Sequence, residues 1–96
     1  MIVTQGQDAR IKLQEPENFR AFSFSTSPGK PLVDSDDVIF QDEHAWISIA
    51  ALQSYPVVSA DPEWRAGLAA MIDYAAGKGW VDGTGERLRA HIERGA

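Results

Sequence analysis

Three side chains able to bind an anion recur at every second position near the end of the sequence. They are Arg87, Arg89 and His91, and apolar residues lie between them. On a β-strand over residues 86–94 the three would share one face, because successive side chains point to opposite sides. Arginine and protonated histidine hold carboxylates and phosphates through charge-assisted hydrogen bonds, and histidine changes charge near neutral pH. The row therefore predicts an anion site; the more common alternative is an exposed face whose charges pair locally and contribute little.

The sequence has no complete signature of catalysis, metal binding or a phosphate loop. Its seven serines include none in a Gly-x-Ser-x-Gly elbow, and His44 and His91 have no zinc-binding spacing. Gly83 and Gly85 form a bare Gly-x-Gly, because Leu88 stands where a dinucleotide fingerprint needs a third glycine. We therefore expect no cofactor, no metal and no catalytic residue. A tryptophan with His44 near one strand end could line a small pocket, although such rings more commonly close the edge of a core.

Acidic residues are concentrated in one ten-residue stretch that an apolar run divides: Asp34, Asp36, Asp37, Asp42 and Glu43. A calcium loop that started at Asp34 would need Gly and Glu where Ile39 and Ala45 stand. We interpret these acids as solvated turns that keep a sheet edge from pairing with other chains.

The structure of residues 86–94 decides whether the basic row exists. Alternation of apolar and polar residues after the turn Asp82-Gly83-Thr84-Gly85 favours a strand. A helix is the alternative, because Leu88 and Ile92 are four positions apart and Glu, Arg, Leu and Ala are good helix formers. We predict the strand.

The first half of the chain has the two-residue period of half-buried strands. Phe22 and Phe24 alternate with serines, and Ile11 and Leu13 alternate with polar residues. Two apolar runs, 38–40 and 45–52, are separated by a polar segment and predict a hairpin. We expect four or five antiparallel strands before residue 55.

A helix is expected over residues 62–78. Its apolar stripe consists of residues at helical spacing, namely Trp64, Leu68, Met71, Ile72 and Ala75. Asp61 is a favourable N-cap, Pro62 suits the first helical position, and glycines at 77 and 79 end the helix. Start, stop and period agree.

Another side of this helix carries small residues where a solvated helix normally has Lys and Glu, including Ala66, Gly67, Ala70 and Asp73. A glycine inside a helix costs about 1 kcal/mol relative to alanine. One explanation is close approach by another backbone, from the same domain or from a second copy across a two-fold axis. The alternative is that alanines are simply good helix formers and the glycine is tolerated.

Composition limits the partners and the compartment. Nine basic and fourteen acidic side chains give a net charge of −5, which disfavours nucleic acid as a partner because phosphate backbones are bound by clusters of Lys and Arg. The sequence has no cysteine, no basic segment ahead of an apolar run and no apolar run of membrane-spanning length. We expect a cytoplasmic protein that does not bind membranes.

These patterns predict one α+β domain over residues 1–96, with an antiparallel sheet of five or six strands and the 62–78 helix packed on one face. We expect a small noncatalytic module that binds a protein partner, or a second copy of itself through the small-residue side of the helix. The alternative is a small enzyme or ligand-binding protein for an anionic metabolite that uses Arg87, Arg89 and His91.

Overall fold

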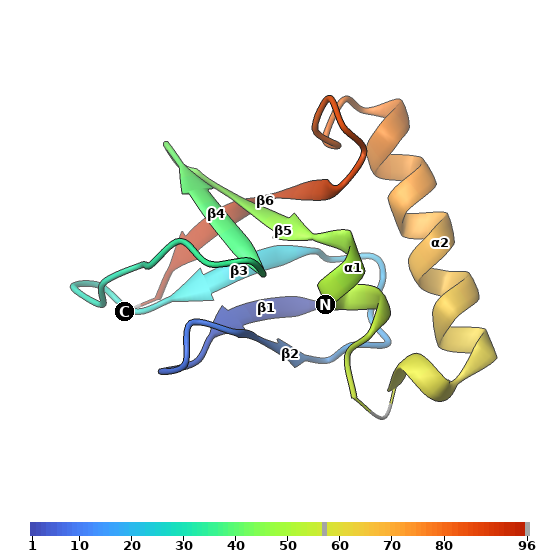
Figure 1. Ribbon diagram of the computed structural model, residues 1–96, viewed down its shortest axis with the longest axis horizontal. Coiled ribbons are helices and arrows are strands. Elements are labelled where there is room, and N and C mark those ends of the chain that lie inside the picture. The colour runs from blue at the N-terminus through green and yellow to red at the C-terminus, as the bar shows by residue number, and fades with distance from the viewer. Residues whose placement is uncertain (57, 96) are drawn as a thin grey trace.

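The computed structural model describes residues 1–56 and 58–95 (Figure 1). Five strands come first, namely β1 (Ile2–Gln5), β2 (Ile11–Gln14), β3 (Ser23–Thr26), β4 (Val38–Gln41) and β5 (His44–Ser48). They are followed by α1 (Ile49–Gln53), the 3-10 helix η1 (Val58–Ala60), α2 (Pro62–Gly77) and β6 (Arg87–Arg94). The α+β class is confirmed, and the last segment is the predicted strand.

The six strands form one curled sheet in the order β2-β1-β3-β6-β5-β4. Three pairs are antiparallel, but β3 runs parallel to both of its neighbours, β1 and β6. The prediction of a purely antiparallel sheet is therefore wrong. Parallel neighbours need a long connection that returns the chain to the same end of the sheet. Here β3 follows the β1–β2 hairpin and residues 15–22, and β6 follows the β4–β5 hairpin and both helices.

The apolar run of residues 45–52, predicted as a strand, divides into β5 and α1. At the junction the Ser48 hydroxyl accepts a hydrogen bond from the N–H of Ala51 at 3.2 Å, which caps the start of α1. Ile49 and Leu52 of α1 then join the core. An apolar run of this length is compatible with either structure, and the cap favours the helix.

One side of the sheet holds the core. Alternate residues of β1, β3, β5 and the first part of β6 are buried, including Val3, Phe24, Ile47, Leu88 and Ala90. Because side chains alternate along a strand, the polar row of β6 lies on the opposite side of the sheet.

On both edge strands, side chains accept hydrogen bonds from backbone N–H groups. On β2, the N–H of Ile11 donates to the Asp37 carboxylate at 3.1 Å, and the N–H of Leu13 donates to the Tyr55 hydroxyl at 3.2 Å. On β4, the N–H of Phe40 donates to the Asp34 carboxylate at 2.9 Å. Two of the acids that we interpreted as guards of a sheet edge therefore cap such edges directly.

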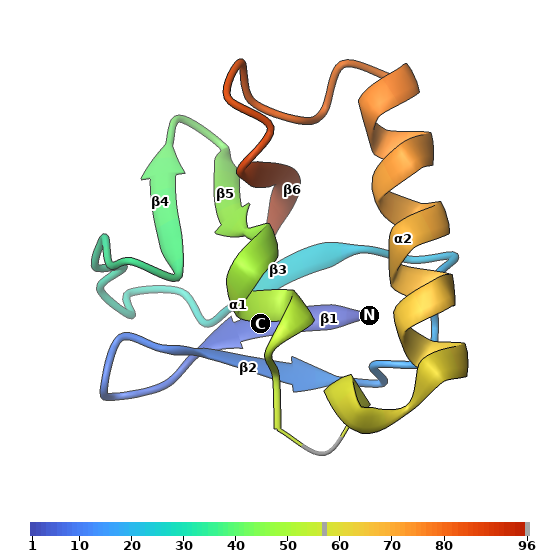
Figure 2. The same cartoon turned by 45° about the vertical axis from the view of Figure 1, so that its right-hand side comes forward.

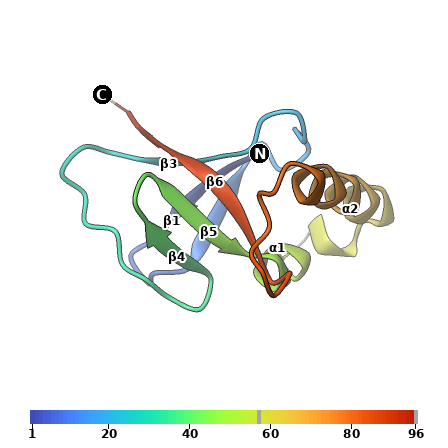
Figure 3. The same cartoon turned by 90° about the horizontal axis from the view of Figure 1, so that it is seen from above.

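Helix α2 begins at the predicted residue and ends one residue before its predicted limit. The Asp61 carboxylate accepts the N–H of Glu63 at 3.0 Å, and Trp64, Leu68 and Ala75 are buried. The helix crosses the ends of the strands where β1, β3 and β6 begin, instead of lying over one face of the sheet (Figure 2, Figure 3). The sheet curls around its own core, and the apolar stripe of α2 packs against that core at the open end. Among the described residues, no helix combines the length and apolar character that crossing a membrane requires.

Candidate functional site

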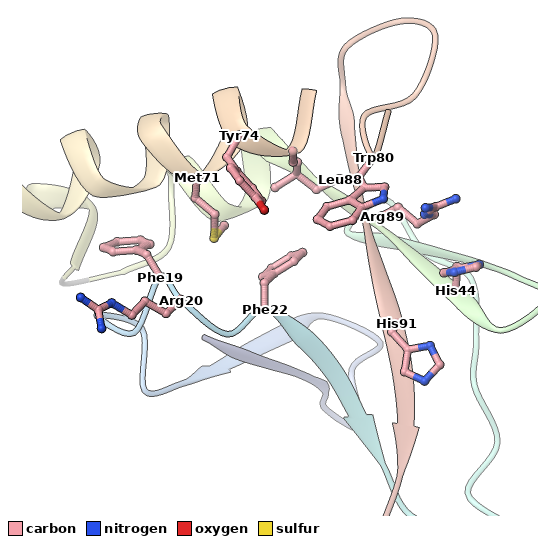
Figure 4. Close-up of a pocket in the computed structure, with 11 residues that line it drawn as sticks. Phe19, Arg20, Phe22, His44, Met71, Tyr74, Trp80, Leu88, Arg89 and His91 are labelled. Atoms are coloured by element: carbon pink, nitrogen blue, oxygen red, sulfur yellow. The ribbon is translucent and has the colours of Figure 1, made fainter. Parts of the chain in front are cut away.

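A cavity of about 440 Å³ opens between the C-terminal half of α2 and the side of β5 and β6 that bears polar residues (Figure 4). The segment just before β3 and Trp80, which lies shortly after the end of α2, complete its walls. It is lined by Phe19, Arg20, Phe22, His44, Met71, Tyr74, Ala75, Trp80, Leu88, Arg89 and His91. The volume lies in the range of pockets that hold small molecules.

Strands β5 and β6 place two histidines and an arginine on this side of the sheet. His44 and His91 are direct partners in the antiparallel register, and their ring centroids are 6.3 Å apart at an interplanar angle of 72°. Arg89 precedes His91 by two residues and therefore shares its face. His44 and Arg89 are half-buried, whereas His91 is exposed.

Aromatic side chains form the other part of the wall. Tyr74 and Trp80 meet edge to face, with ring centroids 6.1 Å apart, and they retain 62% and 36% of their surface exposed. The Lys78 ammonium lies 5.5 Å from the centroid of the Tyr74 ring. Phe22 and Met71 are half-buried and face this space (Figure 4). Aromatic surface left open beside a cavity is available to a ligand.

Within the described part of the chain, none of the residues that line this cavity is Asp or Glu. Its formally charged side chains are Arg20 and Arg89, and its two histidines gain positive charge when protonated. The protein as a whole carries a net charge of −5. The cavity is thus a basic region on an acidic protein, which favours an anionic ligand.

Arg87 takes a different role from the other two members of the predicted basic row. Its guanidinium donates to the carbonyl of Trp46 at 3.2 Å and to the carbonyl of Asp36 at 3.1 Å. It fastens the start of β6 to β5 and to the loop before β4, and it does not line the cavity. The structure therefore brings Arg89 and His91 together with His44, and it places Arg87 outside the group.

Sequence reasoning missed several of the lining residues. Arg20 and Phe22 lie before β3, far from β6 in the sequence, and no local pattern links the two segments. Tyr74 directly precedes Ala75 of the apolar stripe of α2, so it is not itself part of the stripe. Its ring points into the cavity (Figure 4). His44 lines the cavity together with a tryptophan, as the sequence suggests. That tryptophan is Trp80 and not Trp46, which lies on the same strand as His44.

The small-residue side of α2 divides into an exposed part and a contact. Ala66, Ala70 and Asp73 are exposed. At Gly67, an added Cβ would lie 2.4 Å from Cε2 of Phe19, so this ring occupies the space that a side chain would need. A group from the same chain thus accounts for the glycine. Self-association through this side stays a prediction.

A second cavity, of about 540 Å³, lies beside β2 and α1. Its charged lining residues are two acids, Asp8 and Asp37, and two bases, Arg10 and Lys12, so its charge favours neither sign. Asp37 also caps β2. Over residues 1–56 and 58–95 the structure has no group of three or more His, Cys, Asp or Glu side chains placed to hold a metal ion.

Comparisons with family models, with curated proteins and with solved structures gave no match to this chain. The cavity between α2 and β6 is lined by two residues of the predicted anion site, Arg89 and His91. It also has more aromatic lining residues than the second cavity.

Proposed function

We propose that this protein is a noncatalytic binding module that holds a small organic anion in the cavity between α2 and β6. One observation carries the proposal: the ionisable side chains around the cavity are basic, apart from one tyrosine, although the protein is acidic overall. Such a local reversal of charge concentrates anions at the site.

Arg89 is the central group of this proposal. Its planar guanidinium offers up to five N–H donors and pairs with a carboxylate or phosphate through two parallel hydrogen bonds. His44 and His91 add donors from the neighbouring positions on β5 and β6. Met71 and Phe22 would cover the apolar part of the ligand, in the usual division between a few polar anchors and an apolar wall.

The test is a calorimetric titration with a panel of carboxylates and phosphates that carry aliphatic or aromatic groups. We expect at least one member to bind, and Arg89→Gln to weaken its binding roughly 10- to 100-fold, equivalent to about 1.5–3 kcal/mol. Arg65→Gln is the matched control, since Arg65 is exposed on α2 and does not line the cavity. A panel without a binder, or equal affinity in Arg89→Gln, contradicts the proposal.

A second candidate function is binding of a protein partner, or of a second copy, on the exposed side of α2. Ala66, Ala70 and Asp73 are exposed, and their side chains are short. Another chain could therefore approach the backbone of α2 closely at these positions. Light scattering with Ala70→Glu tests the self-association; this variant avoids Gly67, where a new side chain would disturb Phe19. A monomer at high micromolar concentration that Ala70→Glu leaves unchanged rules out the self-association. A cytoplasmic location stays a prediction from composition.

A further inference from the structure

We propose that the ligand of this cavity is an aromatic acid, in which a planar ring packs against Trp80 and an acidic group lies at Arg89. The inference rests on the proposed function and narrows it from organic anions in general to one chemical class. The shared chemistry is a ring that carries a carboxylate or a phosphate.

The cavity has a basic end and an aromatic end. Figure 4 shows Arg89, His44 and His91 gathered on one side, with Phe22, Met71 and Tyr74 on the other and Trp80 between the two groups. Arg20 lies beside Phe19 at the far aromatic end (Figure 4). A ligand whose acidic group lies at Arg89 would place its apolar surface against Trp80 and the aromatic side chains between Arg89 and Arg20.

The backbone of Trp80 is hydrogen-bonded both to α2 and to β6. Its N–H donates to the carbonyl of Ala75 in α2 at 2.9 Å, and its carbonyl accepts the N–H of Arg89 in β6 at 2.7 Å. The next residue, Val81, forms a β-bridge with Leu88. The Trp80 ring and the Arg89 guanidinium therefore belong to two residues whose backbones are hydrogen-bonded to each other. Such preorganisation lowers the entropy cost of binding.

Aromatic walls distinguish a flat ring from a saturated one. Tyr74 and Trp80 already meet edge to face and leave open surface beside the cavity. An aromatic ring that packs against such side chains gains about 0.5–1.5 kcal/mol beyond the area that it buries, which corresponds to roughly two- to twelvefold in affinity. A saturated ring of the same size buries similar area without this gain.

The experiment compares naphthalene-2-carboxylate with its fully saturated decahydronaphthalene counterpart by calorimetry. We expect the aromatic acid to bind roughly two- to twelvefold more tightly. Trp80→Leu should abolish this preference and leave the affinity for the saturated acid within about twofold, whereas Trp80→Phe should retain most of the preference because it keeps a ring. Circular dichroism checks that both variants fold.

Each alternative outcome overturns the inference in a different way. If the saturated acid binds equally well or better, the ligand is not selected for aromaticity, and the proposed function still stands. If the preference persists in Trp80→Leu, Trp80 does not provide the ring contact. If neither acid binds, the inference fails, and the panel of other anions then decides the proposed function separately.

Discussion

At Gly67 the ring of Phe19 lies against the backbone of α2. The same ring packs on Trp64 one turn earlier, with centroids 6.2 Å apart. The Trp64 indole N–H in turn donates to the carbonyl of Pro16 at 2.8 Å. A single missing side chain therefore lets the segment before β3 approach α2 closely, and this segment forms one wall of the cavity.

We expect Gly67→Ala to lower the free energy of unfolding by about 1–3 kcal/mol, because a forced methyl group overpacks the contact with Phe19. Helix propensity alone would predict a gain of up to about 1 kcal/mol. Gly77→Ala is the matched control: its new Cβ would meet nothing within 4 Å, so this variant should gain stability or stay unchanged. Urea denaturation measures both, and equal gains in the two variants would show that Phe19 imposes no constraint.

The roles of individual residues were only partly predictable. The cost of Gly67 inside a helix was evident from the sequence, but its partner Phe19 is distant in the chain and gives no local signal. Arg87 and Arg89 look equivalent as neighbours on one strand face. They differ because two backbone carbonyls from other segments hold the Arg87 guanidinium, and such tertiary partners are not encoded in the spacing.

Asp82 holds the turn that leads into β6, the strand that carries Arg89 and His91. The Asp82 carboxylate accepts the N–H groups of Glu86 at 2.9 Å and Arg87 at 3.2 Å, and the hydroxyl of Thr84 at 3.1 Å. Desolvation opposes ionisation of Asp82, but the backbone hydrogen bonds from Arg87 and Glu86 and the others in this turn outweigh it and lower its pKa below the ordinary value of 3.8.

The lowered pKa predicts how stability depends on pH. A carboxyl group whose pKa is lower in the folded state stabilises the fold above its ordinary pKa, and that contribution is lost as pH falls through the folded value. Asp82→Asn should therefore unfold at lower urea concentration than the wild type at pH 7, and the difference should shrink below about pH 4. Asp73→Asn on the exposed side of α2 is the control, with no change in midpoint expected. A difference for Asp82→Asn that stays constant down to pH 2 would contradict this role.

Elements with complete local signals were predicted closely. Helix α2 has its cap, its proline and its apolar period within one segment, and β6 has its turn and alternation. The pairing of strands was not predictable in the same way, because the position of β6 between β3 and β5 depends on contacts between distant segments. The division of residues 45–52 depended on one capping hydroxyl, that of Ser48.

The path of the chain through the molecule creates the cavity between α2 and β6. Helix α2 crosses the strand ends, and the return through Trp80 into β6 brings aromatic groups of the helix beside basic groups of the sheet (Figure 1, Figure 4). The net charge of −5 repels anions at long range, but salt screens this repulsion beyond about 8 Å. Recognition of an anion therefore depends on the groups in direct contact, above all Arg89.

A map of backbone amide chemical shifts during titration with naphthalene-2-carboxylate would locate the binding site directly. We expect the largest changes at residues 88–91 of β6, at His44 and at Trp80, with small changes along β1 and β2. Changes centred on the second cavity, around Arg10 and Tyr55, or no saturable changes with this acid or any anion of the panel, would contradict the assignment of this cavity as the binding site.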